Sequence, residues 1–372
     1  MLAELEKIGV TSMNVLHMQL SGGFGGIATL SRTINQYSQD RNFFVFLFEG
    51  GCIADELKQS SAGVYVLNSP HWSASNAKKQ YKKICEENKV DVLVSHTGCF
   101  LEFQIILLLK KQFPHLKVIM YEHCDMDMAM GAGIKRKINL YLYRKTFRIA
   151  DAGVAISNFV KQTAIEIDPR FPEKIHVIYN GIDTEKFNYV KRNRKKELRL
   201  IYVGRIVPEK GCKILIEAIS KLPKDIELKL VIAGDGTQYD ECVALSKQLG
   251  LQNQIEFLGS RNDVSELLAK TDVFVHPVTC EEGFGITLAE ALATGLPCIA
   301  FEKGAVKELI EDGVNGFCTR DVSVEGMSRL IEKMYTLFSS EKFEEMSYNA
   351  AISGKKYDIK NTVQQLHELY LK

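Results

Sequence analysis

Short apolar runs alternate with amphipathic segments along almost the whole chain, and this alternation starts twice. In the first part the expected strands are 13–18, 43–48, 64–67, 90–95, 117–121, 153–156 and 175–179. Stretches of helical period lie between most of them, for example 28–39 and 75–88. Alternating strands and helices favour an open, mostly parallel sheet with helices on both faces. The first part is therefore expected to be a doubly wound α/β domain.

The alternation restarts after a polar, basic stretch near 188–195. The expected strands are 198–203, 228–233, 255–258, 273–277 and 298–300, with helices at about 212–221, 240–249, 263–269, 287–293 and 306–311. The tail from Ser323 is expected to be helical. A chain of 372 residues is too long for one ordinary core. We predict a first domain at 1–188 with a returning C-terminal helix at 355–372, a linker at 189–195 and a second domain at 196–354.

Composition excludes several classes of protein. The net charge of +1 offers no global attraction for nucleic acid. The nine cysteines are scattered without CxxC spacing, which favours a reduced cytoplasmic protein with buried thiols. Residues 1–7 carry two acids where a signal peptide would carry bases. The longest early apolar run, 43–48, is far shorter than the about 20 residues that a membrane span needs.

The segment from Glu282 to Glu290 combines two carboxylates, a glycine-flanked turn and the beginning of a helix. Gly283 and Gly285 can bring backbone N–H groups close to an anion, and the positive end of the following helix points to the same place. A diphosphate site with one carboxylate facing a sugar and the other a ribose would need about this layout. A plain strand–turn–helix with surface glutamates is the alternative.

Two cations follow the first strand of the second domain. Arg205 comes directly after Gly204, and Lys210 lies five residues further on, beyond a proline turn. A planar guanidinium and a compact ammonium can converge on one diphosphate. A solvated basic turn would explain the same residues.

Further glycine turns follow strands in both domains. Gly234, Gly236 and the segment around Leu258 could admit a flat base against the backbone. In the first domain, the Gly22–Gly26 loop with Gly23 could approach a sugar or phosphate at a helix N-terminus. This loop also matches part of a dinucleotide fingerprint, with Glu49 as the ribose-binding acid. Ordinary turns remain an alternative for each.

His123 follows a strand of the first domain. Two interpretations stay open, a catalytic residue and a structural one. Asp125 and Asp127 just after it form a DxD pair, which can hold a divalent metal through carboxylates. We expect no metal here, because Arg205 and Lys210 offer another way to neutralise a diphosphate.

The segment 134–148 is strongly basic, with six bases and no acid between Lys135 and Arg148. Ile134, Ile138, Tyr141 and Leu142 share one helical face. Such a helix can rest on an anionic membrane surface. Alternatively, its apolar face packs in the core and its bases are solvated.

Together these residues resemble the retaining glycosyltransferases of the GT-B fold, in particular the family 4 group, also called glycosyl transferases group 1. The resemblance covers most of the chain and is densest from Ile178 to Phe317. It rests on the segment 177–183 with Phe187, Gly204-Arg205 with Lys210, the E-x7-E pair of Glu282 and Glu290, Ala289 with Gly295 and Pro297, Gly304 with Glu308, and 312–316. In the first domain it is limited to Gly22–Gly26, His123 and 155–157. One departure is 277–281, where the family usually has a serine soon after the proline.

The resemblance implies two Rossmann-like domains facing across a cleft, and retaining transfer of a sugar from a nucleotide-diphosphate sugar, with UDP as the expected nucleotide. Arg205, Lys210 and the backbone at 285–287 would stabilise the leaving diphosphate. Glu282 and His123 would contact the donor sugar, and Glu290 the ribose. The implied catalytic residues are Glu282, His123, Arg205 and Lys210; the implied donor-binding residues are Gly23, Gly204, Gly234, Gly236, Leu258, Gly283, Phe284, Gly285, Ile286, Thr287 and Glu290. The nucleotide sugar is a co-substrate, and neither a cofactor nor a metal is implied.

The acceptor stays open among a glycan, a lipid-linked saccharide and other molecules, in cell-surface polysaccharide or glycolipid assembly. The basic segment favours a cytoplasmic protein at the inner face of the membrane. Competing functions are a sugar-nucleotide 2-epimerase on the same fold, a non-catalytic partner subunit, an oxidoreductase using the first glycine loop, and a phosphorylase. No nucleic-acid partner is expected, and the oligomeric state stays open.

Overall fold

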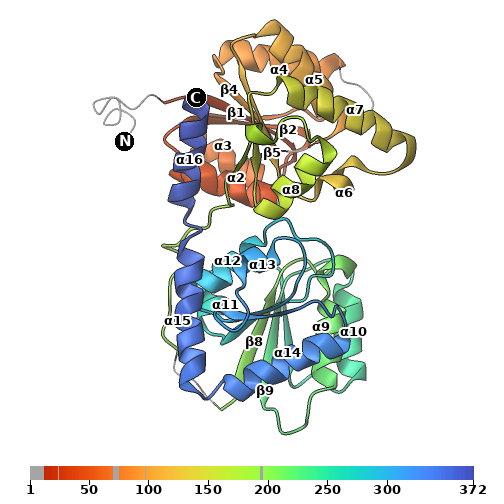
Figure 1. Ribbon diagram of the computed structural model, residues 1–372, viewed down its shortest axis with the longest axis vertical. Helices are drawn as coiled ribbons and strands as arrows, with labels where there is room; N and C mark the ends of the chain where they lie inside the picture. Colours follow the sequence, from red (N-terminus) through yellow and green to blue (C-terminus); the bar gives the residue numbers. More distant parts are fainter. Residues whose placement is uncertain (1–11, 24, 70–74, 97, 193–195) are drawn as a thin grey trace. The chain divides into compact units, whose positions relative to one another are not determined.

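The computed structural model describes residues 12–372 except 24, 70–74, 97 and 193–195. Packing divides the chain into two compact units (Figure 1). Unit 1 comprises Met1–Gly181 and Ile359–Lys372, and unit 2 comprises Ile182–Asp358. The domain boundaries predicted from the sequence differ from those of the two units by a few residues. Which segments move together stays a prediction.

Unit 1 is built on a seven-stranded parallel sheet of order β3-β2-β1-β4-β5-β6-β7. Its strands are β1 (Asn14–Ser21), β2 (Arg41–Glu49), β3 (Gly63–Val66), β4 (Val92–Ser95), β5 (Lys117–Glu122), β6 (Ala152–Ala155) and β7 (Ile175–Val177). Its helices are α2 (Gly26–Tyr37), α3 (Cys52–Ser60), α4 (Ser75–Glu87), α5 (Phe100–Gln112), α6 (Met126–Met130), α7 (Gly133–Ile149), α8 (Asn158–Ile167) and α16 (Ile359–Leu371). Helices α3 and α16 pack on α2, whereas α4 and α7 pack on α5. Figure 1 shows the sheet between these two groups.

The last helix, α16, is part of unit 1, as expected for a C-terminal helix that returns to the first domain. The buried ring of His367 donates to the carboxylate of Asp40 at 2.9 Å. The ammonium of Lys117 on β5 donates to the carbonyl of Tyr370 at 2.6 Å. The chain therefore leaves unit 1 after Gly181 and returns to it at Ile359.

Unit 2 is a second parallel sheet, of order β10-β9-β8-β11-β12-β13. Its strands are β8 (Leu198–Val203), β9 (Leu228–Ala233), β10 (Ile255–Gly259), β11 (Val273–His276), β12 (Cys298–Phe301) and β13 (Gly316–Thr319). Its helices are α9 (Cys212–Ser220), α10 (Tyr239–Gln248), α11 (Val264–Ala269), α12 (Ile286–Ala293), α13 (Val306–Leu309), α14 (Val324–Leu337) and α15 (Glu341–Lys355). The expected helical tail is confirmed by α14, α15 and α16. The sequence did not indicate β13, whose four residues include only one large apolar side chain, Phe317.

Both sheets reverse their strand order at the first strand of the unit. β1 lies between β2 and β4, and β8 lies between β9 and β11. The strands read as nearly continuous apolar runs because helices cover both faces of each sheet. In open α/β sheets, ligands bind beyond the carboxyl ends of the strands at this reversal. The loops after β1, β4, β8 and β11 are therefore where a site is expected in each unit.

Candidate active site

The predicted donor-site residues of unit 2 follow its strands at the carboxyl edge of the sheet. Gly204 and Arg205 follow β8, Gly234 and Gly236 follow β9, and Leu258 lies in β10. Residues 282–285 lie between β11 and α12, and Ile286 and Thr287 begin α12. Backbone hydrogen bonds tie the ends of the first three strands together: Gly204 N–H donates to the Ala233 carbonyl at 3.1 Å, and Gly234 N–H to the Gly259 carbonyl at 2.8 Å. The ends of β8, β9 and β10 are thus joined to one another through their backbones.

Lys210 and Glu282 form an ion pair at this edge. The Nζ of Lys210 lies 2.6 Å from Oε2 of Glu282, although the two residues come from different strand-end loops. The loops are also joined through Thr279, whose N–H donates to the Glu209 carbonyl at 3.0 Å. Of the two predicted cations, the structure therefore brings Lys210 into contact with the carboxylate of Glu282.

Arg205 is placed differently. Its guanidinium is mostly exposed and approaches Glu209 at 4.0 Å. Its backbone carbonyl is fixed by a hydrogen bond of 2.6 Å from the hydroxyl of Tyr202. The side chain therefore projects from a rigid turn and can move toward an anion without breaking a close ion pair.

Glu282 is ionised at neutral pH. Burial alone would raise its pKa, but the His276 ring in its protonated form, together with Lys210 and Arg205, outweighs burial, and the pKa is lowered. The His276 ring lies 3.7 Å from the same carboxylate oxygen. Burial lowers the pKa of His276 to about 4, so its ring is uncharged at neutral pH and Lys210 is the cation that pairs with Glu282.

The loop that carries Glu282 is held by the segment after β12. The N–H of Ala305 donates to the carbonyl of Glu282 at 2.8 Å. Gly304 has φ +54°, and a Cβ at this position would lie 2.2 Å from the carbonyl oxygen of Glu282. Glycine is thus required for the two loops to approach this closely.

Helix α12 begins just after this loop. Gly285 occupies its N-cap in the left-handed region, and no side chain caps the helix. The first N–H groups, at Ile286 and Thr287, therefore begin the helix without a side-chain acceptor, which suits an anion. Phe284 is buried against Tyr357, with ring centroids 5.2 Å apart. Glu290 lies half-buried in the second turn of α12.

In unit 1, His123 directly follows β5. Its Nε2 lies 2.9 Å from Nδ1 of the buried His96, which follows β4. Gly23 follows β1, and its N–H donates to the hydroxyl of Ser21 at 3.3 Å. The same hydroxyl donates to the carboxylate of Glu49 at 3.1 Å. Glu49, the ribose-binding acid of the dinucleotide interpretation, therefore already has a hydrogen-bond partner at the end of β1.

The Asp125–Asp127 pair has local structural partners. Asp125 caps α6 by accepting the N–H of Asp127 at 2.9 Å. The Asp127 carboxylate pairs with Arg136 of α7 at 2.5 Å. Within the described ranges, no cluster of three or more His, Cys, Asp and Glu side chains is arranged to hold a metal ion.

Three of the four residues on the predicted apolar face of α7 are exposed, and the fourth, Leu142, is half-buried. Ile134, Ile138 and Tyr141 are 79%, 44% and 64% exposed. The residues of α7 that are buried instead are Asn139, Tyr143, Thr146 and Phe147. The alternative in which Ile134, Ile138 and Tyr141 pack in the core is therefore wrong. Beside them is a hollow of about 510 Å³, lined by Lys137, Leu140, Tyr141, Arg144, Lys145, Arg148 and Arg170.

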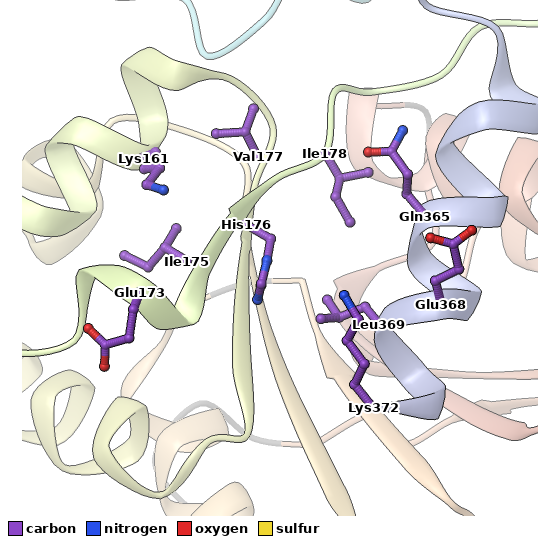
Figure 2. A pocket seen from close by; sticks show the side chains of 10 residues that line it. All are labelled: Lys161, Glu173, Ile175, His176, Val177, Ile178, Gln365, Glu368, Leu369 and Lys372. Carbon is purple, nitrogen blue, oxygen red and sulfur yellow. The ribbon is translucent and has the colours of Figure 1, made fainter.

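A second hollow of unit 1, of about 420 Å³, is separate from all predicted site residues. It is lined by Lys161, Glu173, Ile175, His176, Val177, Ile178, Gln365, Glu368, Leu369 and Lys372. Figure 2 shows side chains of α16 on one side and those of α8 and β7 on the other, with His176 between them. Because both ammonium and carboxylate groups line this hollow, it does not favour a ligand of one particular charge.

Three histidines escaped the sequence prediction: His17, His96 and His276. Each lies in or directly after a strand next to the strand reversal, and His17 interrupts an otherwise apolar run. Their position at strand ends was the available signal for His96 and His276.

In the described part of the chain, no helix combines the length and apolarity needed to cross a bilayer.

Comparisons with known proteins match both halves of the chain to glycosyltransferase families. The family model described as Glycosyltransferase Family 4 matches residues 24–186, and that described as Glycosyl transferases group 1 matches residues 183–352. An uncharacterised glycosyltransferase of Methanocaldococcus jannaschii is 27% identical over 79% of both chains. A Campylobacter jejuni enzyme, N-acetylgalactosamine-N,N'-diacetylbacillosaminyl-diphospho-undecaprenol 4-alpha-N-acetylgalactosaminyltransferase, is 26% identical over 74% of this chain and 75% of its own.

Solved structures give the same fold. The crystal structure of Anabaena HepE in complex with UDP has a TM-score of 0.81 and 24% identity, covering 96% of this chain and 99% of that one. The two family models meet near residue 185 and together cover most of both Rossmann-like units. The chain therefore belongs to the glycosyltransferases of the GT-B fold, in the family described as Glycosyltransferase Family 4 in its first half and Glycosyl transferases group 1 in its second.

Proposed function

We propose that this protein transfers a sugar from a UDP-sugar to an acceptor of cell-surface glycan or glycolipid assembly, with retention at the anomeric carbon. The single observation that carries the proposal is the ion pair of Lys210 with Glu282, next to Arg205 and the uncapped beginning of α12. The pair brings positive groups that suit a diphosphate next to a carboxylate that suits a sugar, at one edge of the sheet of unit 2.

The diphosphate end of the donor is matched by positive groups. Lys210 contributes an ammonium, Arg205 a guanidinium that can swing from the surface, and α12 the N–H groups of its first turn. Such preorganised donors stabilise the charge that develops on a leaving group. Because a diphosphate leaves readily when its charge is met, the proposal needs no general acid and no metal.

The sugar end of the donor is assigned to Glu282. A carboxylate whose pKa is lowered stays ionised, so it accepts hydrogen bonds from hydroxyl groups and stabilises positive charge at the anomeric carbon. A general acid would need a raised pKa instead. Glu290 is assigned to the ribose hydroxyls, and no covalent nucleophile is proposed.

Similarity supports the nucleotide and the class of acceptor. Anabaena HepE is bound to UDP, and the name of the Campylobacter jejuni relative specifies a diphospho-undecaprenol acceptor. The exposed apolar stripe of α7, flanked by lysines and arginines, suits an anionic membrane surface. We therefore place the acceptor reaction at the inner face of a membrane, with α7 as the contact.

The test begins with a panel of nucleotide sugars that is screened for thermal stabilisation of the full chain. A UDP-sugar should stabilise it more than UDP alone. NMR spectra of the selected donor then separate the outcomes: transfer with retention requires acceptor and keeps the anomeric configuration, whereas release of an epimer without acceptor indicates a 2-epimerase. If no nucleotide sugar stabilises the chain, the proposed function is wrong.

A further inference from the structure

A row of hydrogen-bonded side chains crosses unit 1 and ends at His123. The Nε2 of His17 lies 3.1 Å from Oδ1 of Asn42, and its Nδ1 lies 2.8 Å from Nε2 of His96. The Nδ1 of His96 then lies 2.9 Å from Nε2 of His123. These residues come from β2, β1, the end of β4 and the end of β5, which are neighbours in the sheet in this order.

The row is enclosed by protein. His17, Asn42 and His96 are buried. Phe44 stacks on His17 with ring centroids 4.8 Å apart, and Tyr121 stacks on His123 at 4.5 Å. Because water has little access, the inner ring nitrogens must satisfy one another, and each ring constrains the next.

All three rings are neutral at neutral pH. Burial lowers the pKa of His17 to about 4 and that of His123 to about 3. Burial and the two neighbouring histidines hold the pKa of His96 well below its usual range. A neutral imidazole has one N–H and one accepting nitrogen. Each ring therefore donates on one side and accepts on the other, so the row has only two possible directions.

Asn42 selects between these directions. Its Nδ2 lies 3.3 Å from the backbone carbonyl of Asp40, which can only accept. Its Oδ1 must therefore accept from Nε2–H of His17, which leaves Nδ1 of His17 to accept from Nε2–H of His96. By the same rule, Nδ1 of His96 accepts from Nε2–H of His123. The reverse direction would turn two oxygens toward each other at Asp40.

Asp40 is itself held in place. Its carboxylate accepts the ring N–H of His367 from α16 at 2.9 Å and the backbone N–H of Met13 at 3.0 Å. The carbonyl that orients Asn42 therefore belongs to a residue fixed by both the last helix and the segment before β1.

We infer that this row holds His123 as its Nε2–H tautomer and leaves its Nδ1 as a hydrogen-bond acceptor for a hydroxyl group of a bound sugar. The assignment of a sugar rests on the proposed function, whereas the tautomer follows from unit 1 alone. His123 is half-buried, and no described residue forms a hydrogen bond with this Nδ1. Asn42, His17 and His96 are positioning residues, since they act through His123.

The direction of the row decides what His123 can recognise. An accepting nitrogen favours a hydroxyl group, whereas an N–H at the same place would favour an oxygen without a proton, such as one of a phosphate. Asn42 on β2 thereby determines, through His17 and His96, which ligand groups His123 at the end of β5 prefers.

The tautomer is measured by long-range ¹H–¹⁵N correlation NMR of the full chain labelled with ¹⁵N-histidine at neutral pH. His17, His96 and His123 should each show a protonated Nε2 and an unprotonated Nδ1. A protonated Nδ1 at His123, or exchange between both tautomers in the wild-type protein, would overturn the inference. This result does not depend on any activity.

The role of Asn42 is tested by replacement. Asn42→Leu removes the acceptor and should leave His123 as a mixture of tautomers, whereas Asn42→Gln retains an amide with both an acceptor and a donor and should restore the single tautomer. Asn35→Leu on α2, whose amide bonds to Ser60, is the matched control and should change nothing. If Asn42→Leu folds and keeps one tautomer, the inference fails; if it does not fold, the wild-type spectrum and Asn42→Gln still decide.

The sugar contact is tested with the nucleotide sugar selected by the thermal panel. Its binding should shift the Nδ1 resonance of His123, and UDP alone should not. An equal shift with UDP would overturn the sugar contact. If no nucleotide sugar binds, the proposed function and the sugar contact fail together while the tautomer assignment is judged separately. If transfer is confirmed but the tautomer is wrong, only the inference fails.

Discussion

The ammonium of Lys210 lies 2.6 Å from the carboxylate of Glu282, so the two ends of the proposed donor site share one electrostatic contact. A diphosphate that attracts Lys210 must compete with Glu282 for this cation. Binding of the nucleotide would thus free the carboxylate to face the sugar. The pair therefore couples the occupation of the phosphate position to the state of the sugar position.

Lys210→Ala should weaken UDP binding and lower the transfer rate by about 10²–10³, the usual cost of losing one preorganised donor to developing charge. Calorimetry with UDP and single-turnover rates measure the two effects. Lys196→Ala is the control, because Lys196 forms an ion pair of similar length with Glu227 just before β8 and β9, at the opposite edge of the sheet. Unchanged affinity and rate in Lys210→Ala would remove Lys210 from the site.

Glu282→Gln should separate binding from chemistry. It keeps the shape of the side chain but removes the charge that would stabilise the anomeric carbon, so the transfer rate should fall about 100-fold or more. UDP affinity should stay the same or rise, since Lys210 no longer has a competing carboxylate. Equal loss of UDP affinity and rate would instead assign Glu282 to the nucleotide.

Glu290→Ala should weaken the binding of UDP but leave the binding of inorganic pyrophosphate unchanged, because the carboxylate is assigned to the ribose. Loss of one charge-assisted hydrogen-bond pair corresponds to about 1.5–3 kcal/mol. Competition calorimetry with the two ligands measures this difference. Parallel weakening of both ligands would contradict the ribose assignment.

Unit 1 should lose stability as the pH falls from 7 to 5. Its unfolded histidines would bind protons near pH 6.5, whereas burial lowers the pKa of His17 to about 4, that of His123 to about 3 and that of His96 well below its usual range. The unfolded state then binds more protons, which destabilises the folded state by about 1.4 kcal/mol per proton and pH unit.

Glu122 opposes this trend. Burial raises its pKa to about 7, so the folded state retains a proton that the unfolded state has released. Three histidines against one glutamate still favour the unfolded state in acid. Hydrogen exchange resolved by unit should show faster opening of unit 1 at pH 5, and Glu122→Gln should steepen the fall. An equal or larger protection factor for unit 1 at pH 5, after correction for the slower intrinsic amide exchange in acid, would contradict the assignment of neutral rings.

Gly181→Ala should destabilise unit 1 by about 1–3 kcal/mol, the usual cost of overpacking. A Cβ at Gly181 would lie 2.5 Å from the Cα of Ile359 at the beginning of α16. Gly25→Ala is the control, because its Cβ would meet nothing within 4 Å. Urea unfolding of both variants measures the difference, and equal stability would show that α16 can shift without cost.

Replacing Ile134 and Tyr141 with serine should reduce sedimentation of the chain with anionic vesicles, without loss of stability, since both side chains are exposed. Ile352→Ser on α15 is the control, because Ile352 is also exposed. Vesicles of phosphatidylglycerol and phosphatidylcholine at low and moderate salt separate the apolar from the electrostatic contribution. Absence of vesicle binding by the wild-type protein at either salt would reject the membrane contact.

The sequence predicted the two parallel sheets because their buried strands are short apolar runs, and it placed Glu282, Arg205 and Lys210 at strand ends. It could not show that Lys210, rather than Arg205, touches Glu282, since this depends on the pairing of β8 with β11. β13 was missed because Phe317 is the only one of its four residues with a large apolar side chain. The histidine row was missed for another reason: His17, His96 and His123 are distant in sequence, and only the strand order makes them neighbours.

The placement of α16 in unit 1 has a consequence for synthesis. All residues of unit 2 lie between Gly181 and Ile359, and where the chain passes out and back, the N–H of Ile182 donates to the carbonyl of Tyr357 at 2.8 Å. During translation, unit 2 is complete while unit 1 still lacks its last helix, together with the His367 contact to Asp40. The second unit in the sequence can thus be the first to finish folding.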